Sequence, residues 1–222
     1  MTSGGADKGG AYFPALRFDW LTRFYDPILR VTLKEEKFKR RLLEQAGLRA
    51  GHRVLDLGCG TATLTILIKQ ACPEAHVVGL DADPRILAIA RKKAADAGIH
   101  IELRQGLVEA PPFGPASFDR VVSSLVFHHL TTDRKRRTLE QARALLSPGG
   151  ELHVADWGQA GDLLMRAAFV GVQLLDGFET TSDNVRGRLL PMMRDASFVS
   201  VAETHRERTI LGTLSLYRAM RP

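Results

Sequence analysis

The chain has 222 residues, 45% hydrophobic and 25% charged, with a formal net charge of +6. This length suffices for one domain with a single buried core, and the mild positive charge is compatible with an acidic partner without requiring one. We expect a cytoplasmic protein without a membrane span, because no apolar run is long enough to cross a bilayer, the N-terminus lacks the order of a signal peptide, and two cysteines cannot form a disulfide framework.

The first 46 residues are predicted to form a tail and a helical cap. Residues 1–10 contain four glycines and almost nothing apolar, so we expect them to be disordered. Residues 11–46 have apolar side chains at helical spacing, divided at Pro27. The segment 34–46 is basic on one side, which indicates a solvated face or a peripheral contact with an anionic membrane surface.

An apolar run followed by two glycines is the central motif of the chain. Val54 to Leu57 has the composition of a strand buried on both faces of a parallel sheet. Gly58 and Gly60 allow a tight turn and a close approach of a ligand to the backbone. Thr61 or Thr63 is expected to cap the helix that follows. The motif therefore predicts a nucleotide-binding strand, turn and helix.

The residues around this turn indicate which nucleotide it accepts. A dinucleotide fingerprint needs a third glycine where Thr63 stands, which disfavours a nicotinamide dehydrogenase. The first lysine after the turn is Lys69, so the phosphate-loop lysine is also missing. A second buried strand ends at Asp81, whose carboxylate can accept both ribose hydroxyls. The pattern favours an adenosine-like ligand that carries no phosphates.

The remaining chain alternates strands and helices. Strands are predicted at 99–103, 118–124 and 151–156, a helix at 85–97 between Asp83 and Gly98, and a closing hairpin of 198–203 with 209–218 around residues 205–207. The stretch 158–195 is longer than a simple crossover and rich in leucine, and Asp183 or Asn184 is expected to cap a helix within it. We predict that 158–195 is a helical insertion forming part of a lid over the substrate.

Four segments, 54–65, 77–87, 117–130 and 145–157, resemble class I S-adenosylmethionine-dependent methyltransferases in order and spacing, specifically the ubiquinone/menaquinone-methyltransferase-like branch (methyltransferase domain 11/25 type). The resemblance implies an α/β fold: a Rossmann-like, seven-stranded, mostly parallel sheet with helices on both faces, a reversed last strand and an N-terminal helical cap. It assigns residues 47–222 to the methyltransferase domain.

The resemblance also implies the cofactor, S-adenosylmethionine, with S-adenosylhomocysteine as product. The cofactor-binding residues that it implies are Tyr25, Asp56, Gly58, Cys59, Gly60, Asp81, Ala82, Gly106, Leu107, Val108 and Ser124. Leu107 departs from the family, where an aspartate at this place bonds the adenine amino group. Adenine is then expected to be held by apolar packing and by backbone groups of residues 106–108.

His128 is the candidate catalytic residue, because a histidine can take a proton from a hydroxyl, amine or carbon acid. His128 and His129 follow a strand, and extended-chain alternation would place them on opposite sides. The quinone enzymes of the family usually carry an arginine-asparagine pair here, so a quinone acceptor is not simply assigned. No Cys/His set has the geometry of a metal site.

The function predicted from the sequence is methyl transfer by in-line displacement to a small, lipophilic or aromatic acceptor. A methyltransferase of RNA or protein is an alternative, motivated by the net charge, although the chain has no appended RNA-binding module, which disfavours nucleic acid. A non-catalytic S-adenosylmethionine-binding protein is another, motivated by Leu107. The sequence predicts neither the atom methylated nor the oligomeric state.

Overall fold

The computed structural model describes residues 35–222, including all their side chains except those of Glu35, Leu175 and Asp176. The predictions for residues 1–34, including the tail, the first part of the helical cap and the cofactor contact of Tyr25, lie outside the described residues. The boundaries of the methyltransferase domain, 47–222, and of the lid insertion, 158–195, stay predictions.

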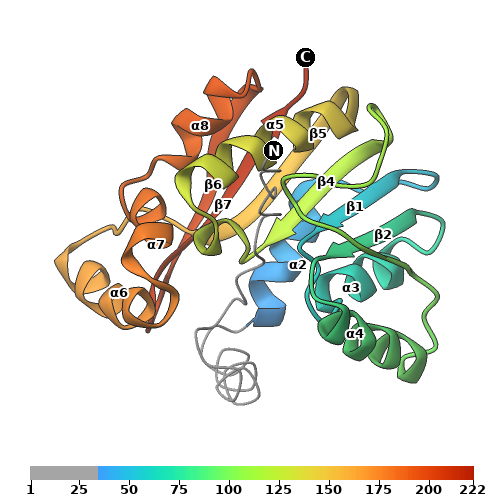
Figure 1. Ribbon diagram of the computed structural model, residues 1–222, viewed down its shortest axis with the longest axis horizontal. Coiled ribbons are helices and arrows are strands. Elements are labelled where there is room, and N and C mark those ends of the chain that lie inside the picture. Colours follow the sequence, from blue (N-terminus) through green and yellow to red (C-terminus); the bar gives the residue numbers. More distant parts are fainter. Residues whose placement is uncertain (1–34) are drawn as a thin grey trace, which may run out of the picture.

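A seven-stranded sheet in the order β3-β2-β1-β4-β5-β7-β6 organises the fold (Figure 1). All neighbouring pairs are parallel except the two that involve β7, which runs antiparallel to β5 and to β6. The predicted mostly parallel sheet with a reversed last strand is confirmed. The strands are β1 (Arg53–Leu57), β2 (His76–Asp81), β3 (Glu102–Gln105), β4 (Phe118–Ser124), β5 (Leu146–Trp157), β6 (Val199–Thr209) and β7 (Gly212–Met220).

Helices cover both faces of this sheet, as predicted. The helices are α2 (Glu35–Ala46), α3 (Thr63–Ala71), α4 (Pro84–Asp96), α5 (Thr132–Leu145), α6 (Leu163–Asp176), α7 (Phe178–Val185) and α8 (Leu189–Asp195), with a short 3-10 turn η1 (Phe127–His129). Successive residues of β1 point to different apolar clusters: Val54 packs with residues of α2 and α3, and Leu55 packs with residues of α5 and α8. This alternation explains why β1 is apolar throughout.

The helix α2 is fastened to the far edge of the sheet. Its basic side chains Lys37 and Arg41 form ion pairs with Glu207 of β6. Gln45 donates hydrogen bonds to the ring of His153 in β5 and to the carbonyl of Tyr217 in β7. Two of the basic residues predicted to face solvent or a membrane are therefore engaged within the molecule.

Five local predictions of secondary structure were wrong. The strand predicted at 151–156 begins at Leu146. The N-cap of α3 is Ala62, in the left-handed region at φ 61°, with no side-chain cap bond. The third strand is 102–105 instead of 99–103. Asp183 and Asn184 lie inside α7 and do not cap a helix. The closing hairpin is longer than predicted, because β6 continues to Thr209 and β7 begins at Gly212.

Within residues 35–222, no helix has both the length and the apolar character needed to span a bilayer.

Candidate active site

The turn after β1 is fixed to the neighbouring strand. The backbone N–H groups of Gly58 and Cys59 both donate to the carbonyl of Leu80 in β2, at 2.8 and 2.9 Å. Gly58 and Gly60 have φ values of 77° and 55°, in the region that favours glycine. This geometry explains the two glycines of the motif.

The two glycines have different surroundings. A Cβ at Gly58 would lie 2.5 Å from a methyl group of Val126, so Gly58 is needed where the turn packs against the segment after β4. A Cβ at Gly60 would meet no atom of the described residues within 4 Å. The close approach predicted for a ligand is therefore available at Gly60, whereas the space at Gly58 is filled by the protein.

Asp81 joins this turn to the end of β2. Its carboxylate accepts the N–H of Gly60 at 2.9 Å through Oδ2 and the N–H of Asp83 at 3.0 Å through Oδ1. Burial raises the pKa of Asp81 above its ordinary value. The backbone N–H of Ala82 also interacts with this carboxylate. An ionised carboxylate has about four acceptor positions, so Asp81 retains capacity for a further donor such as a hydroxyl.

The third part of this edge is the turn after β3. The N–H of Gly106 donates to the carbonyl of Asp81 at 3.0 Å, and Leu107 forms an isolated bridge with Ala110. Val108 is buried, whereas Ala82, Gly106 and Leu107 are partly exposed. The structure thus brings the predicted residues of the second and third strand ends together.

Asp56 and Cys59 lie beneath the turn. Asp56 is 1% exposed and accepts the Thr65 hydroxyl at 2.6 Å, and burial raises its pKa to about 6. Cys59 is buried, and burial raises the pKa of its thiol. These two predicted cofactor residues support the turn: Asp56 bonds the helix that follows it, and Cys59 lies within it. Among the described residues, the buried hydroxyl oxygen of Ser124, at the end of β4, has no hydrogen-bond partner.

His128 is held by a carboxylate that the sequence pattern did not reveal. Asp156, near the end of β5, is fully buried, and its Oδ1 lies 2.7 Å from Nδ1 of His128. His128 is 3% exposed. The available signal was the strand order: Ser124 of β4 pairs with Ala155 of β5, which puts the acid at position 156 beside the segment after β4.

The predicted alternation of the two histidines was wrong. The chain leaves β4 and enters the 3-10 turn η1, so the residues are no longer extended. The ring centroids of His128 and His129 are 3.9 Å apart and tilted by 43°. Burial lowers the pKa of His129 well below its ordinary value, and the neighbouring His128 lowers it further. His129 is therefore neutral near pH 7.

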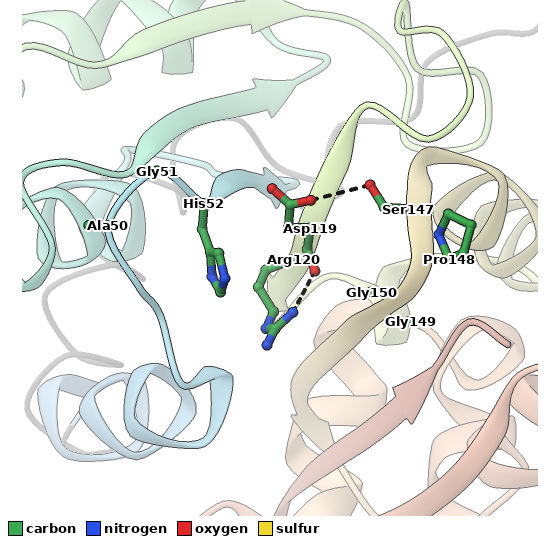
Figure 2. Close-up of a pocket in the computed structure, with 9 residues that line it drawn as sticks. All are labelled: Ala50, Gly51, His52, Asp119, Arg120, Ser147, Pro148, Gly149 and Gly150. Atoms are coloured by element: carbon green, nitrogen blue, oxygen red, sulfur yellow. Dashed lines mark hydrogen bonds between the residues drawn. The ribbon is translucent and has the colours of Figure 1, made fainter.

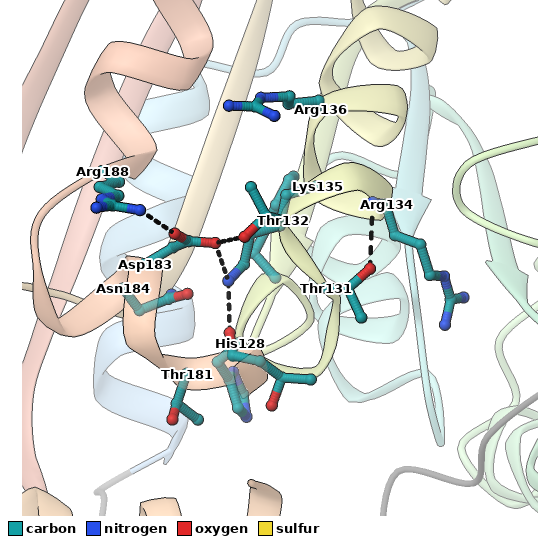
Figure 3. A network of polar contacts seen from close by, with 12 residues as sticks. His128, Thr131, Thr132, Arg134, Lys135, Arg136, Thr181, Asp183, Asn184 and Arg188 are labelled. Carbon is teal, nitrogen blue, oxygen red and sulfur yellow. Dashed lines mark hydrogen bonds and ion pairs between the residues drawn. The ribbon is translucent and has the colours of Figure 1, made fainter. Parts of the chain in front are cut away.

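A buried polar network connects this site to α7 (Figure 3). Lys135 of α5, fully buried, donates to the Thr180 carbonyl at 2.5 Å and lies 3.4 Å from a carboxylate oxygen of Asp183. Thr132 donates to the same Asp183 carboxylate at 2.6 Å. Asn184 donates to Oδ1 of Asp156 at 3.3 Å and to the carbonyl of Trp157 at 3.0 Å. The insertion is thus attached directly to the partner of His128.

A polar depression of about 430 Å³ lies elsewhere (Figure 2). Its lining includes His52, Asp119, Arg120 and residues 147–150, which come from the amino ends of β1, β4 and β5. In a parallel sheet these ends face away from the Gly58–Gly60 turn. Ligands of open α/β sheets bind at the carboxyl ends of the strands, so this depression is separate from the candidate active site. Within the described residues, no group of three or more His, Cys, Asp and Glu side chains has an arrangement that could hold a metal ion.

Comparison with known proteins identifies relatives of the chain. A family model described as a methyltransferase domain matches residues 54–150. A ubiquinone/menaquinone biosynthesis C-methyltransferase of Pseudomonas fluorescens is 30% identical over 206 residues, which cover 83% of this chain and 78% of the relative. A demethylmenaquinone methyltransferase of Thermus thermophilus is 35% identical over 121 residues, 54% of each chain.

The extent of these matches differs. The chain spans about half the length of the first curated relatives that it matches, between 42 and 55%. A solved structure of an S-adenosylmethionine-dependent methyltransferase from Aquifex aeolicus is 17% identical, with a TM-score of 0.63, over 83% of this chain and 89% of that one. At this identity the structural likeness supports the fold alone.

Proposed function

The chain belongs to the methyltransferase family that includes the ubiquinone/menaquinone biosynthesis C-methyltransferases, and we propose that it transfers a methyl group from S-adenosylmethionine to a small-molecule acceptor. The observation that carries the proposal is the open space beside Gly60, bordered by the carboxylate of Asp81. A nucleoside can lie against this bare backbone while Asp81 accepts its ribose hydroxyls.

The residues around this space fit the cofactor. Asp81 has unused acceptor positions, and the Ser124 hydroxyl is buried without a hydrogen-bond partner among the described residues. The proposed contacts are Gly60, Asp81, Ala82, Gly106, Leu107, Val108 and Ser124, with Asp56, Gly58 and Cys59 supporting the turn and Tyr25 as a further proposed contact. When bound, the cofactor supplies a methyl group already activated by its sulfonium charge.

The protein's contribution is positioning and exclusion of water. The acceptor needs to approach in line with the breaking carbon–sulfur bond, and an oriented pair of reactants loses much less entropy on reaction. A base is required only when the acceptor carries a proton at the atom that is methylated. We assign this role to His128.

The proposed acceptor is small and lipophilic or aromatic. The relatives named above are enzymes of quinone biosynthesis, which supports this acceptor class. Aromatic side chains also gather near His128: its ring centroid is 6.4 Å from that of Trp157, which in turn packs at 5.2 Å against Phe169 of α6. An aromatic acceptor would match such surroundings.

Two measurements test the proposal. Calorimetry with S-adenosylhomocysteine should show one binding site, and methyl-labelled S-adenosylmethionine should label members of a panel of quinols and naphthols. Transfer to RNA instead, with an affinity that falls steeply as salt rises, would support the RNA methyltransferase alternative. Binding without transfer to the panel, to RNA or to small molecules of a cell extract would support a non-catalytic role, and absence of binding would contradict the proposal.

A further inference from the structure

Asp156 organises the segment that contains His128. Its Oδ2 accepts the backbone N–H groups of Val126, Phe127 and His128 at 3.1, 2.7 and 3.4 Å. Its Oδ1 accepts from Nδ1 of His128 and from the backbone of Trp157, both at 2.7 Å, and from Asn184. All of these partners, which belong to the described part of the chain, are N–H donors, and this is the environment of a carboxylate.

This arrangement determines which ring nitrogen of His128 is basic. A carboxylate oxygen only accepts, so the short contact requires the proton of the neutral imidazole on Nδ1. The lone pair is then on Nε2. A histidine orientation fixed in this way by a buried acid is the arrangement that makes imidazole an efficient proton acceptor.

We propose that Asp156 is a positioning residue that keeps His128 in the tautomer with its proton on Nδ1, and that Asn184 attaches this pair to α7. The inference rests on the proposed function. As the acceptor atom bonds to the methyl carbon, the carbon–sulfur bond breaks and its electron pair stays on sulfur. The proton of the acceptor passes to Nε2 of His128 and then to water. The substrate class is accordingly an acceptor that carries a proton at the methylated atom, such as a hydroxyl, an amine or a carbon acid.

The attachment to α7 explains why a polar side chain is buried at position 184. Asn184 is 1% exposed and donates to both the Asp156 carboxylate and the Trp157 carbonyl. Lys135, Thr132 and Arg188 hold the neighbouring Asp183. Helix α7 therefore contributes a hydrogen bond to the acid that orients the base.

Nitrogen NMR of histidine-labelled protein tests the tautomer without any substrate. The chain has seven histidines, and the His128 signals are assigned by their loss in His128→Asn, whose amide can still donate to Asp156. The expected result for the wild-type protein is a protonated Nδ1 and an unprotonated Nε2 near pH 7. A ring protonated on Nε2 alone would overturn the proposal, whatever the variants do.

The variant Asp156→Asn tests the cause. Three backbone N–H groups donate to the Oδ2 position, so the oxygen of the introduced amide is expected to lie there. Its NH2 group then faces Nδ1 of His128, which must accept, and the ring proton moves to Nε2. The tautomer should therefore reverse, and labelled transfer to the quinol and naphthol panel should fall by ~10²- to 10⁴-fold. An unchanged tautomer in the folded variant would refute the role of Asp156.

The control is Thr132→Val, which removes a bond to Asp183 in the same network without touching Asp156. In this variant the tautomer of His128 should match that of the wild-type protein. A reversal would mean that any loss of hydrogen bonds in the network changes the tautomer, and that Asp156 has no specific role. A correct tautomer in a protein that transfers to no acceptor would leave the positioning role standing and contradict the proposed function instead.

Discussion

Gly60 and Gly98 offer a matched pair at the scale of single residues. Both have left-handed φ values, 55° and 65°, and within residues 35–222 a Cβ at either would have no neighbour closer than 4 Å. Gly60→Ala and Gly98→Ala should each destabilise the protein by ~1–2 kcal/mol, because of the left-handed backbone. We expect Gly60→Ala alone to weaken S-adenosylhomocysteine binding, by about tenfold or more, because its methyl group enters the ligand space.

Urea denaturation and calorimetry measure the two effects separately. Equal losses of affinity in the two glycine variants would mean that the loss comes from destabilisation. Unchanged affinity in Gly60→Ala would show that no ligand approaches the backbone there.

Asp81 gives a second prediction at this scale. Asp81→Asn keeps the size of the side chain but loses its charge, and one oxygen becomes a donor that faces another N–H. We expect S-adenosylhomocysteine binding to weaken by ~1–3 kcal/mol in calorimetry, the range for charge-assisted hydrogen bonds. Asp96→Asn, a change at an exposed acid paired with Lys92, is the control for net charge and should bind normally.

Single residues were predictable from the sequence where the local pattern determines the geometry. The glycine turn requires particular backbone angles, so the turn at Gly58 and Gly60 and the strand that ends at Asp81 were predicted correctly, whereas their contacts with a ligand stay predictions. The threonine cap was wrong, because Ala62 takes the cap position and the Thr63 hydroxyl accepts from Lys93. The pairing of His128 with Asp156 depends on contacts across 28 residues of chain, which no local pattern reveals.

At the scale of elements, His153 makes β5 sensitive to acid. It is fully buried between Gln45 of α2 and Glu151, and burial lowers its pKa to about 4 from an ordinary value of 6.5. The folded protein therefore binds a proton at His153 less readily than the unfolded chain does. The stability that neutral His153 allows is fully present above pH 6.5 and is lost as the pH falls towards 4. Between about pH 7 and pH 5 the loss is about 2 kcal/mol.

His153→Gln isolates this effect in urea denaturation at about pH 7 and pH 5. Asp56 acts in the opposite direction, because its raised pKa of about 6 makes its contribution grow as the pH falls, so the comparison must be between variant and wild type. The free energy of unfolding of the variant should fall by about 2 kcal/mol less between the two pH values. If the free energy of unfolding changed equally with pH in both proteins, His153 would not be the source of the loss of stability in acid.

Helix α6 has one buried and one exposed apolar face. Phe169 is 3% exposed and packs on Trp157, whereas Leu174 is 70% exposed. We expect Phe169→Ala to cost ~3–5 kcal/mol of unfolding free energy and Leu174→Gln to cost less than about 0.5 kcal/mol. A large loss in Leu174→Gln would show that this face is covered in solution.

Elements were predicted best where burial is complete. β1 and β2 pair along buried strands, and their apolar runs were sufficient. β3, at the edge of the sheet, is mostly exposed, so its limits follow from backbone pairing with β2 and not from the apolar residues 99–103. The turn between β6 and β7 was predicted too early in the chain, because the polar residues 205–207 continue the edge strand instead of forming a turn.

At the scale of the whole molecule, the mostly parallel sheet with its reversed last strand was predicted from the family resemblance, because composition and periodicity alone would allow several arrangements of the strands. The resemblance placed the reversed β7 and the helices on both faces. It did not place the contacts of α7 with η1, because these elements are separated by about 50 residues of chain and no motif of the resemblance includes α7.

The family match covers residues 54–150 and therefore ends before Asp156 and the insertion. The groups proposed to hold the donor are Tyr25, residues between 56 and 108, and Ser124, whereas His128, Asp156 and Asn184 follow them along the chain. His128 lies inside this match, but the acid that orients it and the amide that attaches the pair to α7 lie beyond it. An exchange of the chain after residue 150 would therefore replace Asp156 and Asn184 together, and would leave the groups proposed to hold the donor in place.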